Sequence, residues 1–227
     1  MTHPAYLLAR LNPKNVRFDV GSGGVPELTS QDIAAALGMV PAGLGRELIC
    51  LAWWPSGAML TAPKLAELLE QMQRAEWMRR EESMLDALLA VASHIGGESL
   101  RRAQRVYAAA HAARWPKWVA DPDLGAFAPG YARVRSTVLA ELTSPGLCPS
   151  CEGRGTRQDG NVLAMCQPCR GSGRRAVSES WRAESMQLTV MGYRNIWRSV
   201  YDWTFTQCTD AMATAGRQLS MACAEIN

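Results

Sequence analysis

A repeated cysteine and glycine motif constrains this chain more than any other feature. The segment CPSCEGRGTRQDGNVLAMCQPCRGSGRR, over residues 148–175, contains the pattern C-x-x-C-x-G-x-G twice. Its cysteines are spaced C-x2-C-x14-C-x2-C. Two turns of this kind can place four thiolates around one tetrahedral metal ion. The predicted metal ligands are Cys148, Cys151, Cys166 and Cys169.

Four sulfur ligands favour zinc, and a shell closed by four protein ligands is typical of a structural site. The bound ion would supply folding energy that so short a loop cannot obtain by burying side chains. The glycines support this prediction, because glycine adopts positive φ angles and leaves backbone amides able to face the sulfurs. We therefore expect one structural Zn2+. The alternatives are redox-active dithiols, free thiols and an iron–sulfur cluster.

Composition places the motif in a globular protein. The chain has 227 residues, of which 48% are hydrophobic, and this is enough for one large domain or two small ones. Its seven cysteines are an odd number, and its N-terminus lacks the apolar core of a signal peptide; both argue against a secreted disulfide scaffold. No run of about 18 apolar residues is present. We expect a soluble intracellular protein.

The rest of the chain predicts a mainly α fold, a helical protein with a small four-cysteine zinc-binding insertion and a helix-turn-helix-like C-terminal part. Apolar residues recur at helical spacing between Gly and Pro signals, and Thr29 and Ser30 are candidate N-caps. The expected helices cover residues 31–37, 45–54, 61–95, 98–115, 131–142, 177–189 and 193–225, and the third bends or splits at its charged middle. The expected organisation is a flexible N-terminal arm over 1–28, a helical region over 29–145, a zinc-binding loop over 146–176, and a helix-turn-helix-like region over 177–227 that packs with 29–145.

Positive charge is concentrated around the cysteines. Between positions 148 and 182 the chain has six arginines and three acidic residues, and this positive excess equals the net charge of +3 of the whole chain. Such a local field attracts a polyanion; the alternative is a solvated loop whose arginines keep it soluble. Guanidinium groups on a rigid loop suit phosphate contacts. The arginines predicted to bind DNA here are Arg154, Arg157, Arg174 and Arg175.

The stretch after the cysteines has helix-turn-helix spacing. A helix of about twelve residues, a short turn containing Gly192 and a second helix are expected there. Side chains in the first turns of the second helix would meet base edges, where Arg suits guanine and Asn suits adenine. The alternative is two ordinary packed helices joined by a tight turn. The predicted DNA contacts are Tyr193, Arg194, Asn195 and Arg198, with Trp197, Val200, Tyr201 and Phe205 on the core side.

The order of these features resembles the Q antitermination proteins of lambdoid bacteriophages. That family carries C-x-x-C-x-G-x-G twice in its second half, followed by helices with a Trp-Arg…Tyr element similar to Trp197-Arg198…Tyr201. The segment DIAAALGMVPAGLGRELICLAW, over 32–53, is also similar to the family's D-[VI]-x-A-A-x-G-M helical entry. The resemblance covers roughly residues 30–225, and its cysteine segment is the most specific part.

The resemblance implies transcription antitermination in a bacterial host cell. Members of that family bind DNA at a phage late promoter and engage RNA polymerase that is paused just downstream with its sigma factor attached. They then let the enzyme read through pauses and terminators. The expected partners are double-stranded DNA at a late promoter and bacterial RNA polymerase with sigma factor, with no membrane, in the host cytoplasm. The alternative is a zinc-containing DNA-binding transcription regulator without effect on elongation.

Two other classes are less favoured. No H-E-x-x-H, G-x-S-x-G or Walker pattern is present, and His3, His94 and His111 are isolated, so we expect no enzyme. Chaperones of the DnaJ type carry four glycine-flanked cysteine repeats and a J-domain, whereas this chain has two repeats.

Overall fold

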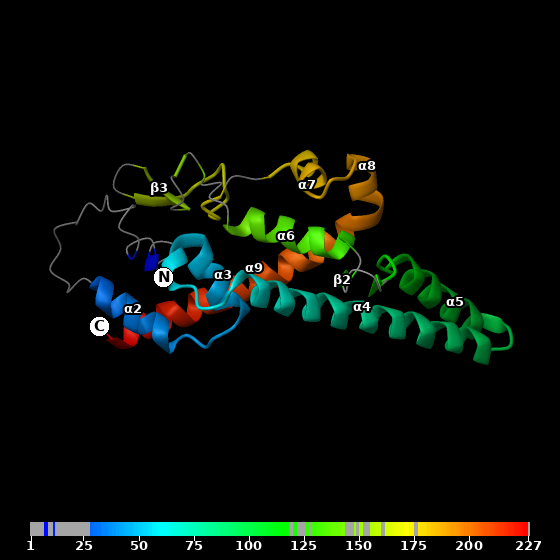
Figure 1. The fold of residues 1–227 in the computed structure, drawn as a ribbon. Helices are drawn as coiled ribbons and strands as arrows, with labels where there is room; N and C mark the ends of the chain where they lie inside the picture. The colour runs from blue at the N-terminus through cyan, green and yellow to red at the C-terminus, as the bar shows by residue number, and fades with distance from the viewer. Residues whose placement is uncertain are drawn as a thin grey trace. The chain divides into compact units, whose positions relative to one another are not determined.

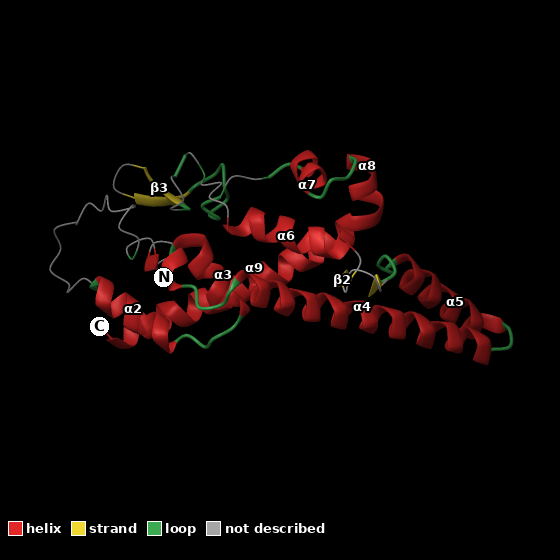
Figure 2. Ribbon diagram, viewed as in Figure 1, coloured by secondary structure: helices red, strands yellow, loops and turns green. Residues whose placement is uncertain are grey.

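The computed structural model describes residues 7–8, 11, 28–118, 120–121, 126–127, 129–143, 148, 150–151, 155–159, 162–174 and 177–226. The described chain is mainly helical, with a small insertion that carries four cysteines, which confirms the predicted fold class (Figures 1 and 2). The arm expected over 1–28 lies almost entirely outside the described residues. The elements are α2 (Ser30–Met39), α3 (Leu44–Trp53), η2 (Pro55–Gly57), α4 (Ala62–Ser93), α5 (Gly97–Ala112), β1 (Ala120–Asp121), β2 (Ala126–Phe127), α6 (Pro129–Thr143), β3 (Thr156–Asp159), β4 (Val162–Met165), α7 (Glu179–Ser185), α8 (Val190–Gly192), η3 (Tyr193–Trp197) and α9 (Arg198–Ile226).

The chain divides into two compact units, and each unit is built from segments that are not consecutive in the sequence. Three of the four boundaries fall within α4, α6 and α9, so these helices contribute residues to both units, and the fourth lies just before α7. The cysteine segment belongs to unit 1, and the segment from α7 to the start of α9 belongs to unit 2. Unit 1 comprises Met1–Leu65, Val138–Ser178 and Phe205–Asn227, and unit 2 comprises Ala66–Thr137 and Glu179–Thr204.

In unit 1, the first described helices begin and end at local sequence signals. Helix α2 starts with a capping box: the Thr29 hydroxyl accepts a hydrogen bond from the Asp32 amide (3.2 Å), and the Asp32 carboxylate accepts one from the Thr29 amide (2.7 Å). This confirms the helix start expected at Thr29 and Ser30. Helix α3 ends at Trp53, two residues before Pro55 opens the short 3-10 helix η2.

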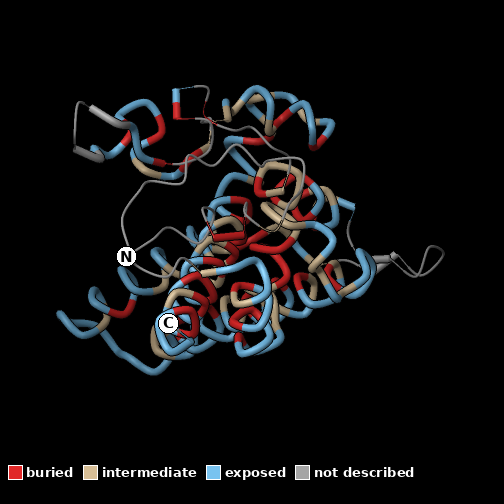
Figure 3. Tube along the Cα trace, turned by 90° about the vertical axis from the view of Figure 1, so that its left-hand side faces the viewer, coloured by how far each residue is buried: buried red, intermediate tan, exposed pale blue. Residues whose placement is uncertain are grey.

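The core of unit 1 combines α2 and α3 with the C-terminal half of α9. Gly45 lets α3 approach α9 closely, because a Cβ atom there would overlap the Ala211 carbonyl. A buried carboxylate fixes the chain after η2: Glu47 is 2% exposed and accepts hydrogen bonds from the amides of Met59 (2.7 Å) and Leu60 (2.9 Å). The buried apolar residues, red in Figure 3, include Ile33, Leu37, Leu48, Ile49, Cys50, Cys208, Met212 and Leu219.

Helix α4, most of which belongs to unit 2, is a single helix, so its charged middle does not split it. A buried polar network joins it to α6 and α9. The Gln73 amide donates to the Thr204 hydroxyl (2.9 Å), and Arg135 donates to the Gln73 oxygen (3.1 Å) and to the Glu70 carboxylate (2.8 Å). Gln73 and Thr204 are fully buried. Each buried polar group in this network therefore has a partner, which limits the cost of burying it.

Aromatic side chains fill the other part of unit 2. Tyr131 is fully buried, and its hydroxyl donates a hydrogen bond to the Pro116 carbonyl (2.6 Å). Its ring lies 4.1 Å from the Trp118 ring and 5.1 Å from the Trp197 ring, centroid to centroid. Gly130 makes room for this packing, because a Cβ atom there would overlap the Trp197 ring. The π-helix η3 is thereby held against α6 through Trp197.

Among the described helices, none combines the length and the apolar composition needed to cross a bilayer.

Candidate metal centre and nucleic-acid interface

The four predicted ligands lie together in unit 1. Their Sγ atoms are all within 4.8 Å of one another, and all four side chains are buried. The Sγ atoms of Cys148 and Cys166 are 3.8 Å apart, and those of Cys151 and Cys169 are 3.6 Å apart. A tetrahedral ion with metal–sulfur bonds of about 2.3 Å requires sulfurs about 3.8 Å apart. This group, called the cysteine cluster below, could therefore hold one metal ion.

A β-hairpin connects the two halves of the cysteine cluster. Strands β3 and β4 are antiparallel, with Thr156 opposite Met165. The halves are also joined by two matching hydrogen bonds: the Cys166 amide donates to the Gly155 carbonyl, and the Cys148 amide donates to the Gly173 carbonyl, both at 2.9 Å. The first cysteine of each C-x-x-C turn is thus tied to the last glycine of the other repeat. The repeated sequence produces a repeated backbone arrangement.

The glycines adopt the conformations that the sequence predicts. Gly155, Gly171 and Gly173 have φ angles of 72°, 82° and 70°, and Gly153 lies outside the described residues. The Gly155 amide donates to the Cys151 sulfur (3.3 Å). A Cβ atom at Gly155 would also overlap the Gly171 carbonyl. Positive φ, close backbone approach and an amide that faces a sulfur are therefore combined at one position.

Burial and backbone amides shift the pKa values of three cluster thiols in different directions. Burial raises the pKa of Cys166 to about 12 and also raises that of Cys151. At Cys148, burial is outweighed by the amides of Ser150 and Cys151, and the pKa falls to about 7. With their pKa values raised above that of an ordinary thiol, Cys151 and Cys166 would be protonated at neutral pH without a metal. Metal binding to this cluster would release protons.

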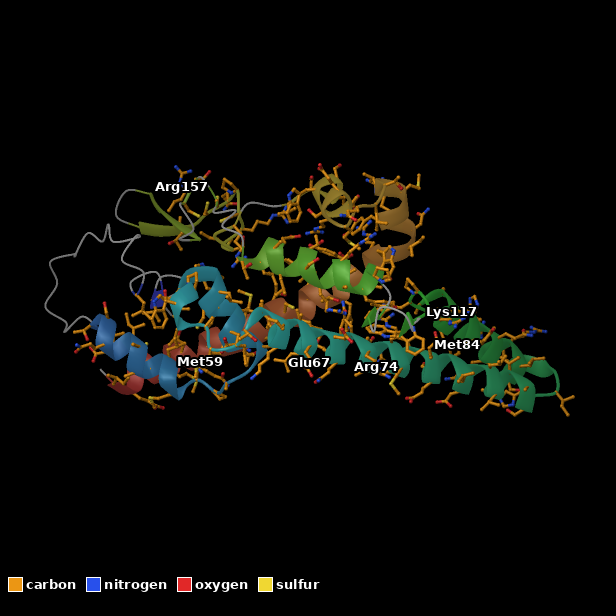
Figure 4. The ribbon with its side chains drawn as sticks, viewed as in Figure 1. Met59, Glu67, Arg74, Met84, Lys117 and Arg157 are labelled. Carbon is orange, nitrogen blue, oxygen red and sulfur yellow. The ribbon has the colours of Figure 1, made fainter. Side chains whose placement is uncertain are left out.

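The structure describes two of the four arginines predicted to bind DNA around the cysteines. Arg157 is exposed on β3 (Figure 4), whereas Arg154 and Arg175 lie outside the described residues. Arg174 packs within unit 1: its guanidinium lies 5.1 Å from the centroid of the Trp53 ring and donates to the Glu141 carbonyl (3.3 Å). Burial lowers its pKa. These contacts count against the prediction that Arg174 binds DNA, because they hold its guanidinium within unit 1 and attach the cysteine segment to α3 and α6.

In unit 2, two helices joined by a short turn follow the cysteine segment, but the turn lies earlier than predicted. Helix α7 ends at Ser185, and Gln187 adopts a positive φ of 57°. The Leu188 amide donates to the Ala183 carbonyl (2.8 Å), as in a Schellman motif. Thr189 then caps the next helix by accepting a hydrogen bond from the Gly192 amide (3.0 Å). The prediction that the turn contains Gly192 is therefore wrong, because Gly192 lies inside the second helix.

The start of the second helix contains a π-helical turn, η3, in which the Arg198 amide donates to the Tyr193 carbonyl. Tyr193 is fully buried, and its ring meets the Tyr201 ring edge-on at 5.7 Å between centroids. The prediction that Tyr193 faces DNA is wrong for this structure, because the earlier helix start turns its ring toward the core. Val200 and Tyr201 are buried, as predicted.

Three of the predicted contacts remain exposed on the second helix: Arg194, Asn195 and Arg198. We call these three residues the arginine face. A carboxylate that sequence reasoning missed pairs with it: Glu179 of α7 lies 2.6 Å from Arg194 Nε and 3.3 Å from Arg198 Nη1. Glu179 is 15 positions from Arg194, so helical periodicity could not reveal the pair. The available signal was an acidic residue at the start of one helix and arginines near the start of the next.

Comparison with known proteins does not extend this description. No family model, curated protein or solved structure matches the chain. What the chain can bind is therefore inferred from its own residues: a buried cysteine cluster in unit 1 and an exposed arginine face in unit 2.

Proposed function

We propose that this chain is a phage transcription antitermination factor. In this proposal it binds DNA at a late promoter, loads onto promoter-proximally paused RNA polymerase of the bacterial host and lets the enzyme read through pauses and terminators. The observation that carries the proposal is the buried cysteine cluster followed by two helices with exposed arginines. This order of features is the one in which the sequence resembles the lambdoid Q proteins.

The proposed ion in the cysteine cluster is Zn2+. Three observations support this choice: the sulfurs have tetrahedral spacing, the ligands are buried, and a backbone amide donates a hydrogen bond to the Cys151 sulfur. Zinc would fix the two C-x-x-C turns and contribute free energy to the folding of a segment in which most of the other described side chains are exposed or half-buried. Its role is structural, because the four thiolates would complete its coordination.

The proposed DNA contacts are divided between the two units. In unit 2, Asn195 and the two arginines of the arginine face have the donors that suit adenine and guanine edges. In unit 1, Arg157 is exposed on the β3–β4 hairpin and suits a phosphate contact. Arg154 and Arg175 belong to the same arginine-rich segment and remain proposed phosphate contacts from the sequence alone.

Single-round transcription tests this function. Bacterial RNA polymerase would be started at the phage late promoter and run through a strong terminator, with and without the protein. The proposal predicts read-through that disappears when the upstream DNA element is replaced by unrelated sequence. Read-through that is independent of that element would contradict the proposed loading step.

A zinc-containing DNA-binding regulator without effect on elongation is the second candidate. It requires only the cysteine cluster and the exposed arginine face, and no surface for polymerase. Unchanged termination together with retained binding to the promoter DNA would favour this candidate and contradict antitermination.

A further inference from the structure

One carboxylate occupies both guanidinium groups of the arginine face. The Glu179 Oε2 atom accepts a hydrogen bond from Arg194 Nε at 2.6 Å, and its Oε1 atom lies 3.3 Å from Arg198 Nη1. Both carboxylate oxygens are therefore engaged, each by a different arginine. In the protein without DNA, the two groups proposed to read bases already have an anionic partner.

The surroundings keep this carboxylate charged and partly covered. The Glu179 side chain is 28% exposed, whereas Arg194 and Arg198 are 54% and 55% exposed. The hydrogen bond from Arg194, with the charges of Arg198 and Arg182, holds the pKa of Glu179 below its usual range despite burial. Asp202 is a looser partner of Arg198, at 3.5 Å from its Nε atom. The two arginine side chains are thus about twice as exposed as the carboxylate side chain that pairs with them, so an incoming anion can reach them.

We propose that Glu179 is a specificity-determining residue, whose carboxylate holds Arg194 and Arg198 until a DNA site offers acceptors to both. This inference rests on the proposed DNA-binding function. A free guanidinium is attracted by any phosphate, which gives affinity independent of sequence. DNA that offers an acceptor to only one of the two arginines must separate both from Glu179 and replaces only one of the two lost contacts. A site with guanine acceptors at both positions replaces both, so the carboxylate weakens nonspecific binding more than specific binding.

The variant Glu179→Gln tests this inference, because it keeps the size of the side chain and removes its charge. With one or two arginines released for phosphates, we expect about 10- to 50-fold tighter binding of nonspecific duplex DNA at low salt. The slope of log K against log salt should become steeper by about 1–2. Binding of a specific duplex should tighten less, so that the ratio of specific to nonspecific affinity falls.

Glu184→Gln is the matched control. Glu184 lies on the same helix, is exposed, and makes no ion pair with any residue in the described part of the chain. Its replacement removes the same charge without releasing an arginine, so nonspecific affinity should change by less than about threefold. A third variant, Arg194→Gln with Arg198→Gln, should abolish the effect of Glu179→Gln when the two are combined.

The measurement is fluorescence anisotropy at several KCl concentrations. The probes are a labelled random-sequence duplex and a duplex that the wild-type protein selects from a random-sequence pool. Thermal unfolding checks that each variant is folded; if Glu179→Gln is not, Glu179→Asp replaces it, since the shorter side chain moves the carboxylate away from the arginines. Tighter nonspecific binding and a steeper salt slope, both lost without the two arginines, support the inference.

Two results would overturn it, and they differ in what else they affect. If the wild-type protein binds DNA and the Glu179 and Glu184 variants behave alike, the inference is wrong while the proposed function stands. If the wild-type protein binds neither duplex at low salt, the proposed DNA-binding function is contradicted and the inference with it.

Discussion

The cysteine cluster of unit 1 and the arginine face of unit 2 place their functional groups in opposite environments. The four cysteines are at most 7% exposed, whereas Arg194 and Arg198 are more than half exposed. Buried thiols can meet only a small ion, but exposed guanidinium groups can meet a macromolecule. The first region is suited to hold the fold together, and the second is suited to recognise a partner.

The contrast between the two regions depends most on whether the cysteine cluster holds a metal ion. Cys151→Ser should remove one of four ligands and leave the others in a shell that no longer closes, so that bound zinc is lost. Native mass spectrometry should find one zinc ion per wild-type chain and none in the variant. Cys223→Ser is the control, because Cys223 is also buried but lies outside the cluster. Full metal content in Cys151→Ser would show that the four sulfurs are not the ligands.

Thiol labelling sharpens the distinction between the cluster and the other cysteines. Burial raises the pKa of Cys50 to about 11 and that of Cys208 to about 12, and it also raises that of Cys223. The thiolate is the reactive form, so these three thiols should react slowly at neutral pH. Chelation of the metal in the native protein should unfold the cysteine segment and remove the burial that raises the pKa of Cys151 and Cys166. The four cluster thiols alone should then react, counted by mass after alkylation. Labelling of all seven at once would indicate that loss of the metal unfolds the whole chain.

A methyl group added at Gly155 should weaken metal binding by the cysteine cluster without removing a ligand. Gly155→Ala places a Cβ atom at a φ of 72° and against the Gly171 carbonyl. We expect a cost of about 2–3 kcal/mol, or roughly 30- to 150-fold weaker zinc binding in a competition titration with a chelator. Gly38→Ala is the control, because nothing lies within 4 Å of a Cβ atom there. Equal zinc affinities in the two variants would contradict the tight backbone packing at Gly155.

On the arginine face, Asn195→Ala should have the smallest effect. The loss of one base contact should weaken binding to a selected duplex by about 1–3 kcal/mol while nonspecific affinity and zinc content stay unchanged. The measurement is anisotropy with the two duplexes described above. An equal loss on both duplexes would place Asn195 at a phosphate and not at a base.

The two regions also differ in how far the sequence predicts them. At the cysteine cluster, ligand spacing and glycine positions are local in the chain, and the four ligands and the positive φ angles of Gly155, Gly171 and Gly173 follow directly. At the arginine face, tertiary packing decides which side chains are exposed and which lie in the core. Gln187 ends α7 in a conformation usually taken by glycine, and a π-helical turn follows, so Tyr193 lies in the core. Neither feature has a signal in residue spacing.

The same limit explains the pairs that were missed. Arg174 resembles its neighbours in sequence, but its contact with Trp53 joins positions 121 residues apart. Glu179 meets Arg194 and Arg198 across the turn between two helices. Long-range pairs of this kind are specified by the fold and not by local patterns, whereas the capping box at Thr29 and Asp32 was visible in four consecutive residues.

The most direct test of the division of roles measures zinc content and DNA affinity together in one variant, Arg194→Gln with Arg198→Gln. The account predicts that this protein keeps one zinc ion per chain, unfolds at the wild-type temperature, and loses most of its affinity for the selected duplex. Wild-type affinity for that duplex would contradict the assignment of DNA recognition to the arginine face. Loss of zinc would contradict the assignment of the metal to the cysteine cluster alone.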